Sequence, residues 1–134
     1  MIAIDSSVAV AAFASWHDRH ADARAALAGE YALVAHAGVE TYSVLTRLPA
    51  PHRAEPQLAA DYLRRQFRRP WLTLDRRAQA ALPARLAGLG IAGGAVYDAL
   101  VGLTAATAGA ALASCDERAF RVYELCGVQV QPLA

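Results

Sequence analysis

The sequence predicts an α/β fold, in which a central, mostly parallel sheet of four or five strands is flanked by helices. Short apolar runs alternate along the chain with longer stretches whose apolar residues recur at helical spacing. This alternation is typical of strand–helix–strand crossovers, which place successive strands parallel in one sheet. The chain has 134 residues, of which 56% are hydrophobic and 19% charged. That size and composition fit a single domain over residues 1–134 with a well-buried core, and they exclude a disordered chain.

The first half of the chain is expected to contain two strands, each followed by helical segments. We expect strands at 2–4 and 31–34, and helices at 7–14, 21–28 and 38–48. Ser6 or Ser7 is placed to cap the first helix, because a hydroxyl oxygen can accept a hydrogen bond from a free backbone N–H. Gly29 is a typical end for the second helix. Pro49 ends the third, and a surface loop follows it.

The second half continues the same alternation. A helix that buries Leu58, Tyr62, Leu63 and Phe67 is expected to run to about Arg69. It is followed by strands at 71–74, 110–113 and 128–130, and by helices at 76–86, 94–108 and 117–125.

Two patterns in this half imitate functional motifs. Asp75 follows a strand, but with arginines after it we interpret it as a helix cap. The segment 88–93 matches the G-x-G-x-x-G dinucleotide pattern literally. That pattern is meaningful only between a strand and a helix, whereas here it follows a helix. We therefore expect a loop.

Charge and cysteine content narrow the classes of partner and compartment. The net charge is +1 and every basic residue is an arginine, so attraction to nucleic acid or membrane must come from a local patch. Cys115 and Cys126 show no metal-binding spacing and are expected to be reduced thiols of a cytoplasmic protein. Asp5 interrupts the apolar run that a signal peptide needs. The apolar stretch 86–115 contains several glycines and Asp98, which favours a buried core segment over a membrane span.

Four acidic residues lie in apolar surroundings, where carboxylates are rarely found without a partner. They are Asp5, Glu40, Asp98 and Asp116. Asp98 is the only charged residue between Arg85 and Asp116, and removing an ion from water costs about several kcal/mol. In open α/β sheets, ligand sites form beyond the carboxyl ends of the strands. Asp5 and Asp116 follow strands, and Glu40 and Asp98 lie near helix starts, so all four are expected to meet at that edge.

A cluster made only of carboxylates suits Mg²⁺, or Mn²⁺, better than zinc. Such a cluster activates water and stabilises the charge that develops when a phosphodiester is attacked. Each acid also has a purely structural interpretation. Asp5 and Asp116 could cap helices, Glu40 could be a solvated helix residue, and Asp98 could be a lone polar group bonded to a hydroxyl. The shared position at one sheet edge favours the metal site.

Four segments, in this order, carry a resemblance that covers nearly the whole chain. They are Ile2-Ala-Ile-Asp-Ser-Ser-Val8, Val39-Glu-Thr-Tyr-Ser-Val-Leu-Thr46, Gly94-Ala-Val-Tyr-Asp-Ala-Leu100 and Ser114-Cys-Asp-Glu-Arg-Ala-Phe120. With them the chain resembles PIN-domain ribonucleases, and more closely the VapC toxins of VapBC toxin–antitoxin pairs. The resemblance implies a three-layer α/β/α domain and a Mg²⁺-dependent endoribonuclease.

The same resemblance implies roles for particular residues. Asp5, Glu40, Asp98 and Asp116 would be the catalytic and metal-binding acids. Asp5 and Asp98 would be the firmest ligands, Glu40 would help hold the metal or position water, and Asp116 would act directly or through water. Ser7 and Ser114 would support the site, with Ser114 standing where the family usually has Thr.

Partners follow from the resemblance as well. It implies cleavage of a cellular RNA (tRNA, rRNA or mRNA), inhibition of translation, a VapB-type antitoxin whose tail enters the active-site groove, and a homodimer. Arginines on and after one predicted helix, together with a polar break near residue 17, are candidates for binding RNA or the antitoxin. These candidates are Arg64, Arg65, Arg68, Arg69, His17 and Arg19. A solvated helix face is the alternative for the arginines.

Other functions compete with the nuclease. Receiver domains and haloacid-dehalogenase-like phosphatases also place an Asp after the first strand, but both normally use a Lys, and this chain has none. A Walker-type nucleotide loop fails for the same reason. The remaining rival is a catalytically inactive PIN-like module that binds RNA or an antitoxin. Such a module typically lacks one of the acids, and here all four are present.

Overall fold

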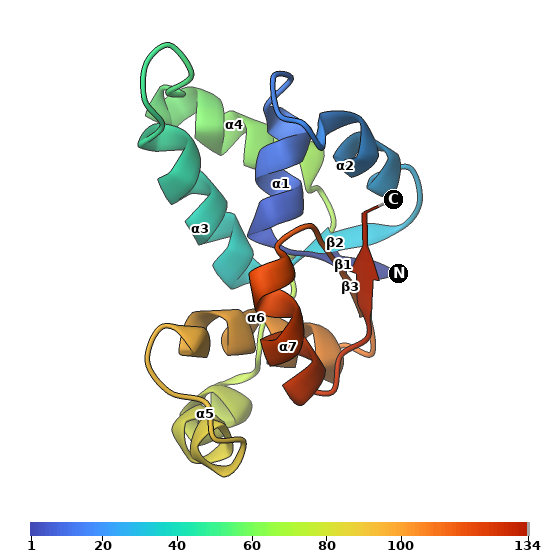
Figure 1. The fold of residues 1–134 in the computed structure, drawn as a ribbon, viewed down its shortest axis with the longest axis vertical. Coiled ribbons are helices and arrows are strands. Elements are labelled where there is room, and N and C mark those ends of the chain that lie inside the picture. Colours follow the sequence, from blue (N-terminus) through green and yellow to red (C-terminus); the bar gives the residue numbers. More distant parts are fainter. Residues whose placement is uncertain (134) are drawn as a thin grey trace.

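The central sheet has four parallel strands in the part of the chain that this computed structural model describes, residues 1–133. The spatial order is β2-β1-β3-β4. The strands are β1 (Ile2–Ile4), β2 (Tyr31–Leu33), β3 (Ala111–Ser114) and β4 (Val130–Pro132). In the register, Ile4 lies between Leu33 and Ala113. The carboxyl ends of β1, β2 and β3 therefore open onto one edge (Figure 1).

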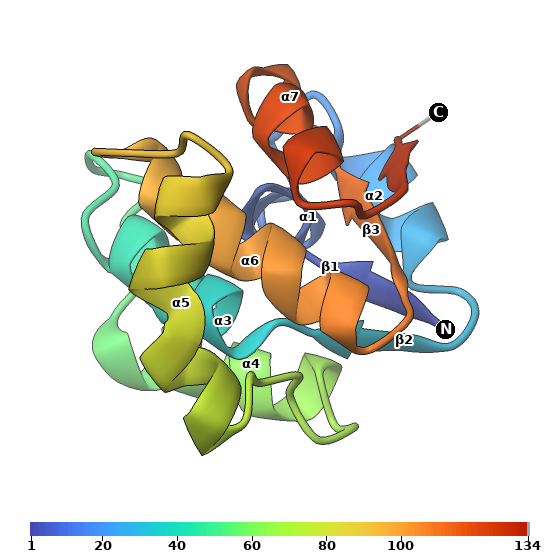
Figure 2. The same cartoon turned by 90° about the horizontal axis from the view of Figure 1, so that it is seen from below.

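Helices cover both faces of this sheet, as the predicted three-layer fold requires. Helices α1 and α2 lie on one face, and α6 and α7 on the other, while α5 packs outside α6 (Figures 1 and 2). Their bounds are α1 (Ser6–Phe13), α2 (His20–Ala26), α3 (Ala35–Thr46), α4 (Pro56–Gln66), α5 (Arg76–Gly88), α6 (Ala95–Thr107) and α7 (Glu117–Leu125).

The core is built largely from small aliphatic side chains. Ile4, Leu33, Leu103 and Leu112 are fully buried, and many alanines fill the space between helices and sheet. Small side chains let the helices approach the sheet closely. Gly102 of α6 is one such point, since a Cβ there would lie 3.2 Å from the Tyr123 ring of α7. Within residues 1–133, no helix is long and apolar enough to cross a membrane.

The strand predicted at 71–74 is wrong. Only Leu72 pairs with the sheet edge, through a single parallel bridge to Val34. Its N–H donates to the Leu33 carbonyl at 2.9 Å, and its carbonyl accepts from the Ala35 N–H at 2.9 Å. The chain turns into α3 at Ala35, so β2 offers no further edge. Pro70, which precedes this segment, has no N–H to add to a ladder.

Several predicted boundaries also shift. Asp5 caps α1, in place of the predicted Ser6 or Ser7, because its carboxylate accepts a hydrogen bond from the Val8 N–H at 3.1 Å. Helix α3 begins three residues before the predicted start, α4 ends at Gln66 instead of near Arg69, and β4 lies two residues later than expected.

The Asp75 cap is confirmed, with its carboxylate accepting from the Ala78 N–H at 2.7 Å. In the glycine-rich 88–93 segment, Gly88 is the last residue of α5, and residues 89–93 form the predicted loop.

Candidate active site

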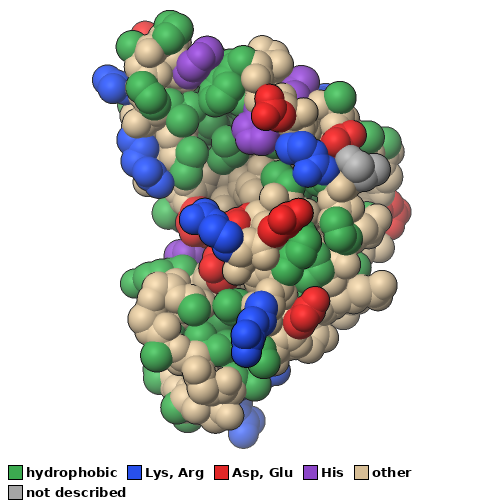
Figure 3. Space-filling model, viewed as in Figure 1, with side chains coloured by type: hydrophobic (Ala, Val, Ile, Leu, Met, Phe, Trp, Pro, Cys, Tyr) green, Lys and Arg blue, Asp and Glu red, His purple; other side chains and the backbone are tan. Residues whose placement is uncertain are grey.

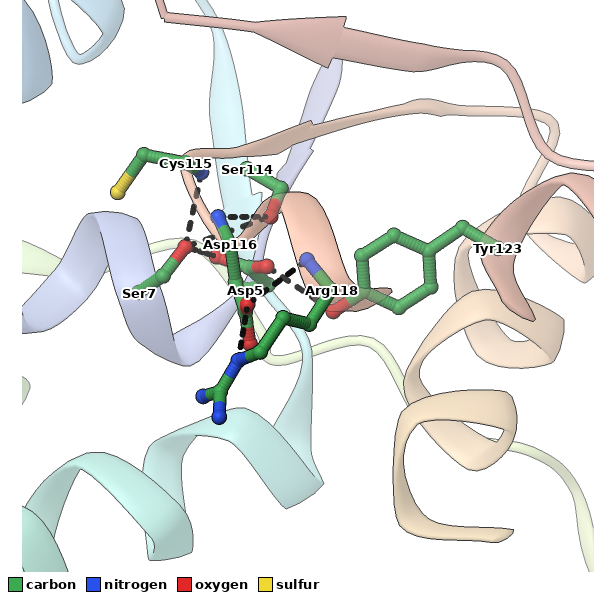
Figure 4. A network of polar contacts seen from close by, with 7 residues as sticks. All are labelled: Asp5, Ser7, Ser114, Cys115, Asp116, Arg118 and Tyr123. Atoms are coloured by element: carbon green, nitrogen blue, oxygen red, sulfur yellow. Dashed lines mark hydrogen bonds and ion pairs between the residues drawn. The ribbon is translucent and has the colours of Figure 1, made fainter. Parts of the chain in front are cut away.

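Asp5 lies at the carboxyl end of β1 and is only 2% exposed. Its Oδ1 accepts hydrogen bonds from the Ser7 hydroxyl at 2.6 Å and from the Val8 N–H at 3.1 Å. Its Oδ2 accepts from the Tyr123 hydroxyl at 3.0 Å, so both oxygens are held (Figure 4). Burial raises the pKa of Asp5, and the surrounding hydroxyl and amide donors oppose that rise only in part.

Ser7 and Ser114 tie the start of α1 to the end of β3. The Ser7 Oγ accepts a hydrogen bond from the Cys115 N–H at 3.0 Å and lies 3.4 Å from the Ser114 Oγ. The Ser114 Oγ accepts from the Asp116 N–H at 3.1 Å. These two hydroxyls therefore connect the loop that carries Asp116 to the carboxylate of Asp5 (Figure 4).

Asp116 follows β3 and caps α7. Its Oδ1 accepts from the Arg118 backbone N–H at 3.2 Å and from the Arg118 Nε at 3.4 Å. The Arg118 side chain is 94% exposed, so this ion pair contributes little to stability. The Asp116 Oδ2 makes no hydrogen bond with any group of residues 1–133, and it is therefore available to another partner.

Glu40 and Asp98 are brought to the same edge by α3 and α6, and both are half-buried. Asp98 lies in the first turn of α6, and is not in the middle of the core as its apolar flanks suggested. Burial, followed by the charges of Asp98 and Asp5, raises the pKa of Glu40 to about 7. Burial and the charge of Asp116 raise the pKa of Asp98, while the charges of Arg118 and His36 oppose this rise. The negative charges of Asp98 and Asp5 therefore act on Glu40, and that of Asp116 acts on Asp98.

The donors are all oxygens, which is the chemistry that Mg²⁺ or Mn²⁺ prefers. Across residues 1–133, however, no three His, Cys, Asp or Glu side chains already converge closely enough to enclose a metal ion. The structure therefore provides a cluster of mutually repelling acids, and metal ligation by Asp5, Glu40, Asp98 and Asp116 stays a prediction. Asp5 and Asp116 do cap helices, as their structural interpretation proposed. Capping occupies only the Oδ1 of each residue; the Oδ2 of Asp5 accepts from the Tyr123 hydroxyl, whereas no hydrogen bond within residues 1–133 occupies the Oδ2 of Asp116.

Sequence reasoning missed several residues of this site. Tyr123 is buried in α7, and its ring packs over Gly102, which positions its hydroxyl at Asp5. His36 lies one helical turn before Glu40, with its Nε2 3.7 Å from the Glu40 Oε1. The i, i+4 spacing of His36 and Glu40 was a signal in the sequence. Tyr123 had no comparable signal, because its partner is distant along the chain.

A groove of about 370 Å³ borders Asp116, and the other three acids do not line it. Arginine and acidic side chains gather around the hollow in the middle of this face (Figure 3). The predicted binding residues His17 and Arg19 both line the groove. Arg19 is also held by Asp22 at 3.1 Å and by the Leu133 carbonyl at 2.7 Å. The full lining is Ser6, Ser7, Val10, His17, Arg19, Val44, Cys115, Asp116 and Arg118.

The predicted arginine patch lies elsewhere. Arg64, Arg68 and Arg69 surround a larger, mainly apolar pocket of about 540 Å³ between α3 and α4, and none of the four acids lines it. Arg65 lines a smaller pocket of about 390 Å³, which shares Arg64 and Arg68 with the larger one. The ion pairs of Arg64 with Asp61 (3.4 Å) and of Arg69 with Glu30 (3.8 Å) are exposed and weak. A role of this patch in RNA or antitoxin binding stays a prediction, separate from the acidic site.

A parallel α/β sheet with acidic residues beyond its carboxyl edge is compatible with a class of proteins that includes metal-dependent phosphodiesterases. Comparison with known proteins narrows this class. The PIN domain family model matches residues 2–125, so the chain belongs to the PIN-domain family.

Named relatives refine the assignment to the VapC-type ribonucleases. The chain is 50% identical over 131 residues to the protein named Ribonuclease VapC40 in two strains of Mycobacterium tuberculosis, which covers 98% of each chain. It is also 48% identical over 130 residues to Ribonuclease VapC27 of strain H37Rv, covering 96% of this chain and 94% of the relative. The resemblance predicted from the four sequence segments is therefore confirmed.

Proposed function

We propose that this protein is a Mg²⁺-dependent endoribonuclease toxin, in which Asp5, Glu40, Asp98 and Asp116 bind the metal and form the catalytic site. The observation that carries the proposal is the position of these acids, which β1, α3, α6 and the start of α7 bring to one edge of the sheet. Burial raises the pKa of Glu40 and of Asp98, and neighbouring negative charges add to that rise. A divalent cation would relieve this repulsion. Relatives named ribonucleases support the same activity.

The residues around the cluster have distinct roles in this proposal. Ser7, Val8 and Tyr123 hold the Asp5 carboxylate in one orientation. Glu40, half-buried on α3, positions the attacking water. A bound Mg²⁺ would lower the pKa of that water and stabilise charge on the phosphate. Arg118, at the border of the groove, is placed to attract the RNA phosphates.

The partners of this proposal follow from the VapC names of the relatives. A VapB-type antitoxin would neutralise the protein. The free protein would inhibit translation and would act as a homodimer.

For the patch of Arg64, Arg65, Arg68 and Arg69, the adjoining pocket favours the antitoxin over RNA. The pocket is lined by Leu63, Phe67 and Trp71, which suit the apolar side chains of a peptide. The arginines suit acidic residues of the same peptide.

The first test is metal-dependent stabilisation. Thermal unfolding is followed while Mg²⁺ is added to the wild-type protein, to Asp98→Asn, and to Glu124→Gln as a control at an exposed acid outside the cluster. Wild type and Glu124→Gln are expected to gain stability with Mg²⁺, and Asp98→Asn is not. Equal stabilisation of all three proteins by Mg²⁺ would contradict metal binding at the cluster. It would favour a catalytically inactive PIN-like module that binds RNA or an antitoxin.

The second test is activity. Cleavage of total cellular RNA in vitro, followed by sequencing of the cleavage ends, identifies the substrate class among tRNA, rRNA and mRNA. Asp5→Ala and Asp98→Ala are expected to abolish both cleavage and growth inhibition. A folded Asp98→Ala protein that stays toxic would refute the mechanism.

A further inference from the structure

An aromatic pair, in which one ring is exposed and the other is partly buried, lies beside the acidic cluster. Tyr97 immediately precedes Asp98 in α6 and is 58% exposed. Its ring lies almost parallel to that of His36 in α3, with 5.7 Å between ring centroids and 10° between planes. His36 is in turn 3.7 Å from Glu40. The pair is therefore held between the two helices that carry Glu40 and Asp98.

The geometry of this pair differs from that of the buried aromatic residues. Core rings meet edge to face, as Tyr31 with Phe67 and Tyr62 with Phe67 do, both at 85°. His36 and Tyr97 are the only flat stack among the ring pairs of residues 1–133. The Tyr97 hydroxyl makes no hydrogen bond within that range. What Tyr97 offers to solvent is therefore an aromatic surface with a fixed plane.

The position of the pair indicates which ligand could bind to the exposed ring of Tyr97. The groove that contains Arg118 borders Asp116, while the aromatic pair borders Glu40 and Asp98. An RNA strand with a phosphate at the acids would place neighbouring bases within this region. Bases of single-stranded RNA commonly stack on exposed aromatic side chains, with little dependence on sequence.

We propose that Tyr97, supported by His36, is a stacking site for an unpaired RNA base next to the phosphodiester that the four acids would cleave. The inference rests on the proposed nuclease function. It adds a residue that positions the substrate through its base, whereas the acids act on the phosphate. Since only an unpaired base exposes its ring face, the site selects unpaired RNA over duplex, with little dependence on sequence.

The test measures binding with and without bases. Fluorescence anisotropy in Mg²⁺ gives affinities for a twelve-nucleotide oligoadenylate and for a twelve-unit abasic phosphodiester of the same charge. All variants are made on an Asp116→Asn background, which prevents cleavage while Asn preserves the cap of α7. We expect Tyr97→Ala to weaken oligoadenylate binding about ten-fold and to leave the abasic oligomer unchanged. Tyr97→Phe retains affinity, because the hydroxyl has no partner.

Tyr42→Ala is the matched control. Tyr42 is also exposed, at 38%, but lines the separate apolar pocket. It is expected to leave the affinity for both oligomers unchanged. Equal losses for both oligomers with Tyr97→Ala, or no loss for oligoadenylate, would overturn the stacking site. A change from dimer to monomer in Tyr97→Ala, measured by light scattering, would also overturn the stacking site, since Tyr97 would then belong to a contact between protein chains.

Failure of the stacking site and failure of the nuclease give different results. Cleavage is measured separately, in the protein with Asp116 intact. Metal-dependent cleavage by that protein, without any base-dependent loss of affinity in Tyr97→Ala, removes only the stacking site. Base-dependent binding through Tyr97, in a protein that cleaves no RNA, supports the stacking site and removes the nuclease proposal.

Discussion

The hydroxyl group of Tyr123 donates a hydrogen bond to the Oδ2 of Asp5 at 3.0 Å, joining residues 118 positions apart. Tyr123 is positioned by the packing of α7 on α6, where Gly102 leaves room for its ring. Asp5 is positioned by β1 and by the first turn of α1. The orientation of a candidate metal ligand therefore depends on helix packing on the opposite face of the sheet.

Removing this hydroxyl tests the relationship. Tyr123→Phe keeps the ring but leaves a buried carboxylate oxygen without its donor, which is expected to cost about 1–3 kcal/mol of the free energy of unfolding. It should also weaken stabilisation by Mg²⁺, because the Asp5 carboxylate is no longer held. Urea unfolding with and without Mg²⁺ measures both effects. Tyr42→Phe, at an exposed position, should change stability by less than about 0.5 kcal/mol. Equal stability of the two variants would contradict this role.

The fold was largely predictable because it depends on patterns that are local in sequence. Apolar runs such as 2–4 and 110–113 lead into helical segments, and this order alone specifies parallel strands with helical crossovers. The failure at 71–74 has a tertiary cause. Trp71 and Leu74 are typical strand residues, but the Trp71 indole packs against Gly38 of α3 and the edge of β2 ends at Leu33.

The candidate site also has a part that could be predicted from the sequence and a part that could not. Its acids could be identified because a carboxylate in an apolar segment is unusual at any single position, as for Asp98. Ser7 and Ser114 were named only through the family resemblance, and the buried donor Tyr123 was not predicted at all. Tyr123 is ordinary in its own helix, and only the folded chain shows that its hydroxyl reaches Asp5. The arginine patch was recognisable as a cluster, but its distance from the acids depends on how α4 packs.

Ser7 provides a second test of the hydroxyl network. Its Oγ donates to Asp5 at 2.6 Å and accepts from the Cys115 N–H at 3.0 Å. Ser7→Ala removes both bonds and is expected to cost about 1–3 kcal/mol, since the Cys115 N–H loses its acceptor and Asp5 loses one of its three donors. Ser6→Ala is the matched control, because Ser6 makes no side-chain hydrogen bond within residues 1–133. Denaturant unfolding of both proteins measures the difference. Similar losses would show that the cost reflects the first turn of α1 alone.

Gly38 tests the contact that replaces the predicted strand. A Cβ at Gly38 would lie 2.5 Å from the Trp71 ring, so Gly38→Ala must displace the indole. We expect a loss of about 1–3 kcal/mol in the free energy of unfolding. Gly88→Ala, in a helix with open space around the new methyl group, should be neutral or stabilise by up to about 1 kcal/mol. Trp71 fluorescence should shift only in Gly38→Ala. An unchanged spectrum and stability would mean that the indole does not depend on this contact.

The raised pKa of Glu40 predicts how stability depends on pH without metal. Its pKa is about 7 in the folded protein and 4.5 when unperturbed, so between these values the folded state binds more protons than the unfolded state. The contribution of Glu40 is therefore present below pH 4.5 and is lost as the pH rises to about 7. The lowered pKa of His36 acts in the opposite sense, so total stability alone is not diagnostic.

Comparison with Glu40→Gln isolates the effect. In thermal unfolding with a chelator present, the melting temperature of wild type relative to Glu40→Gln should fall as the pH rises from 4.5 to about 7. Added Mg²⁺ should stabilise wild type more at pH 7 than at pH 5, because protons compete with the cation for the carboxylates. If the difference between the two proteins does not change with pH, Glu40 does not share the charge of the cluster. The four acids would then not form one site.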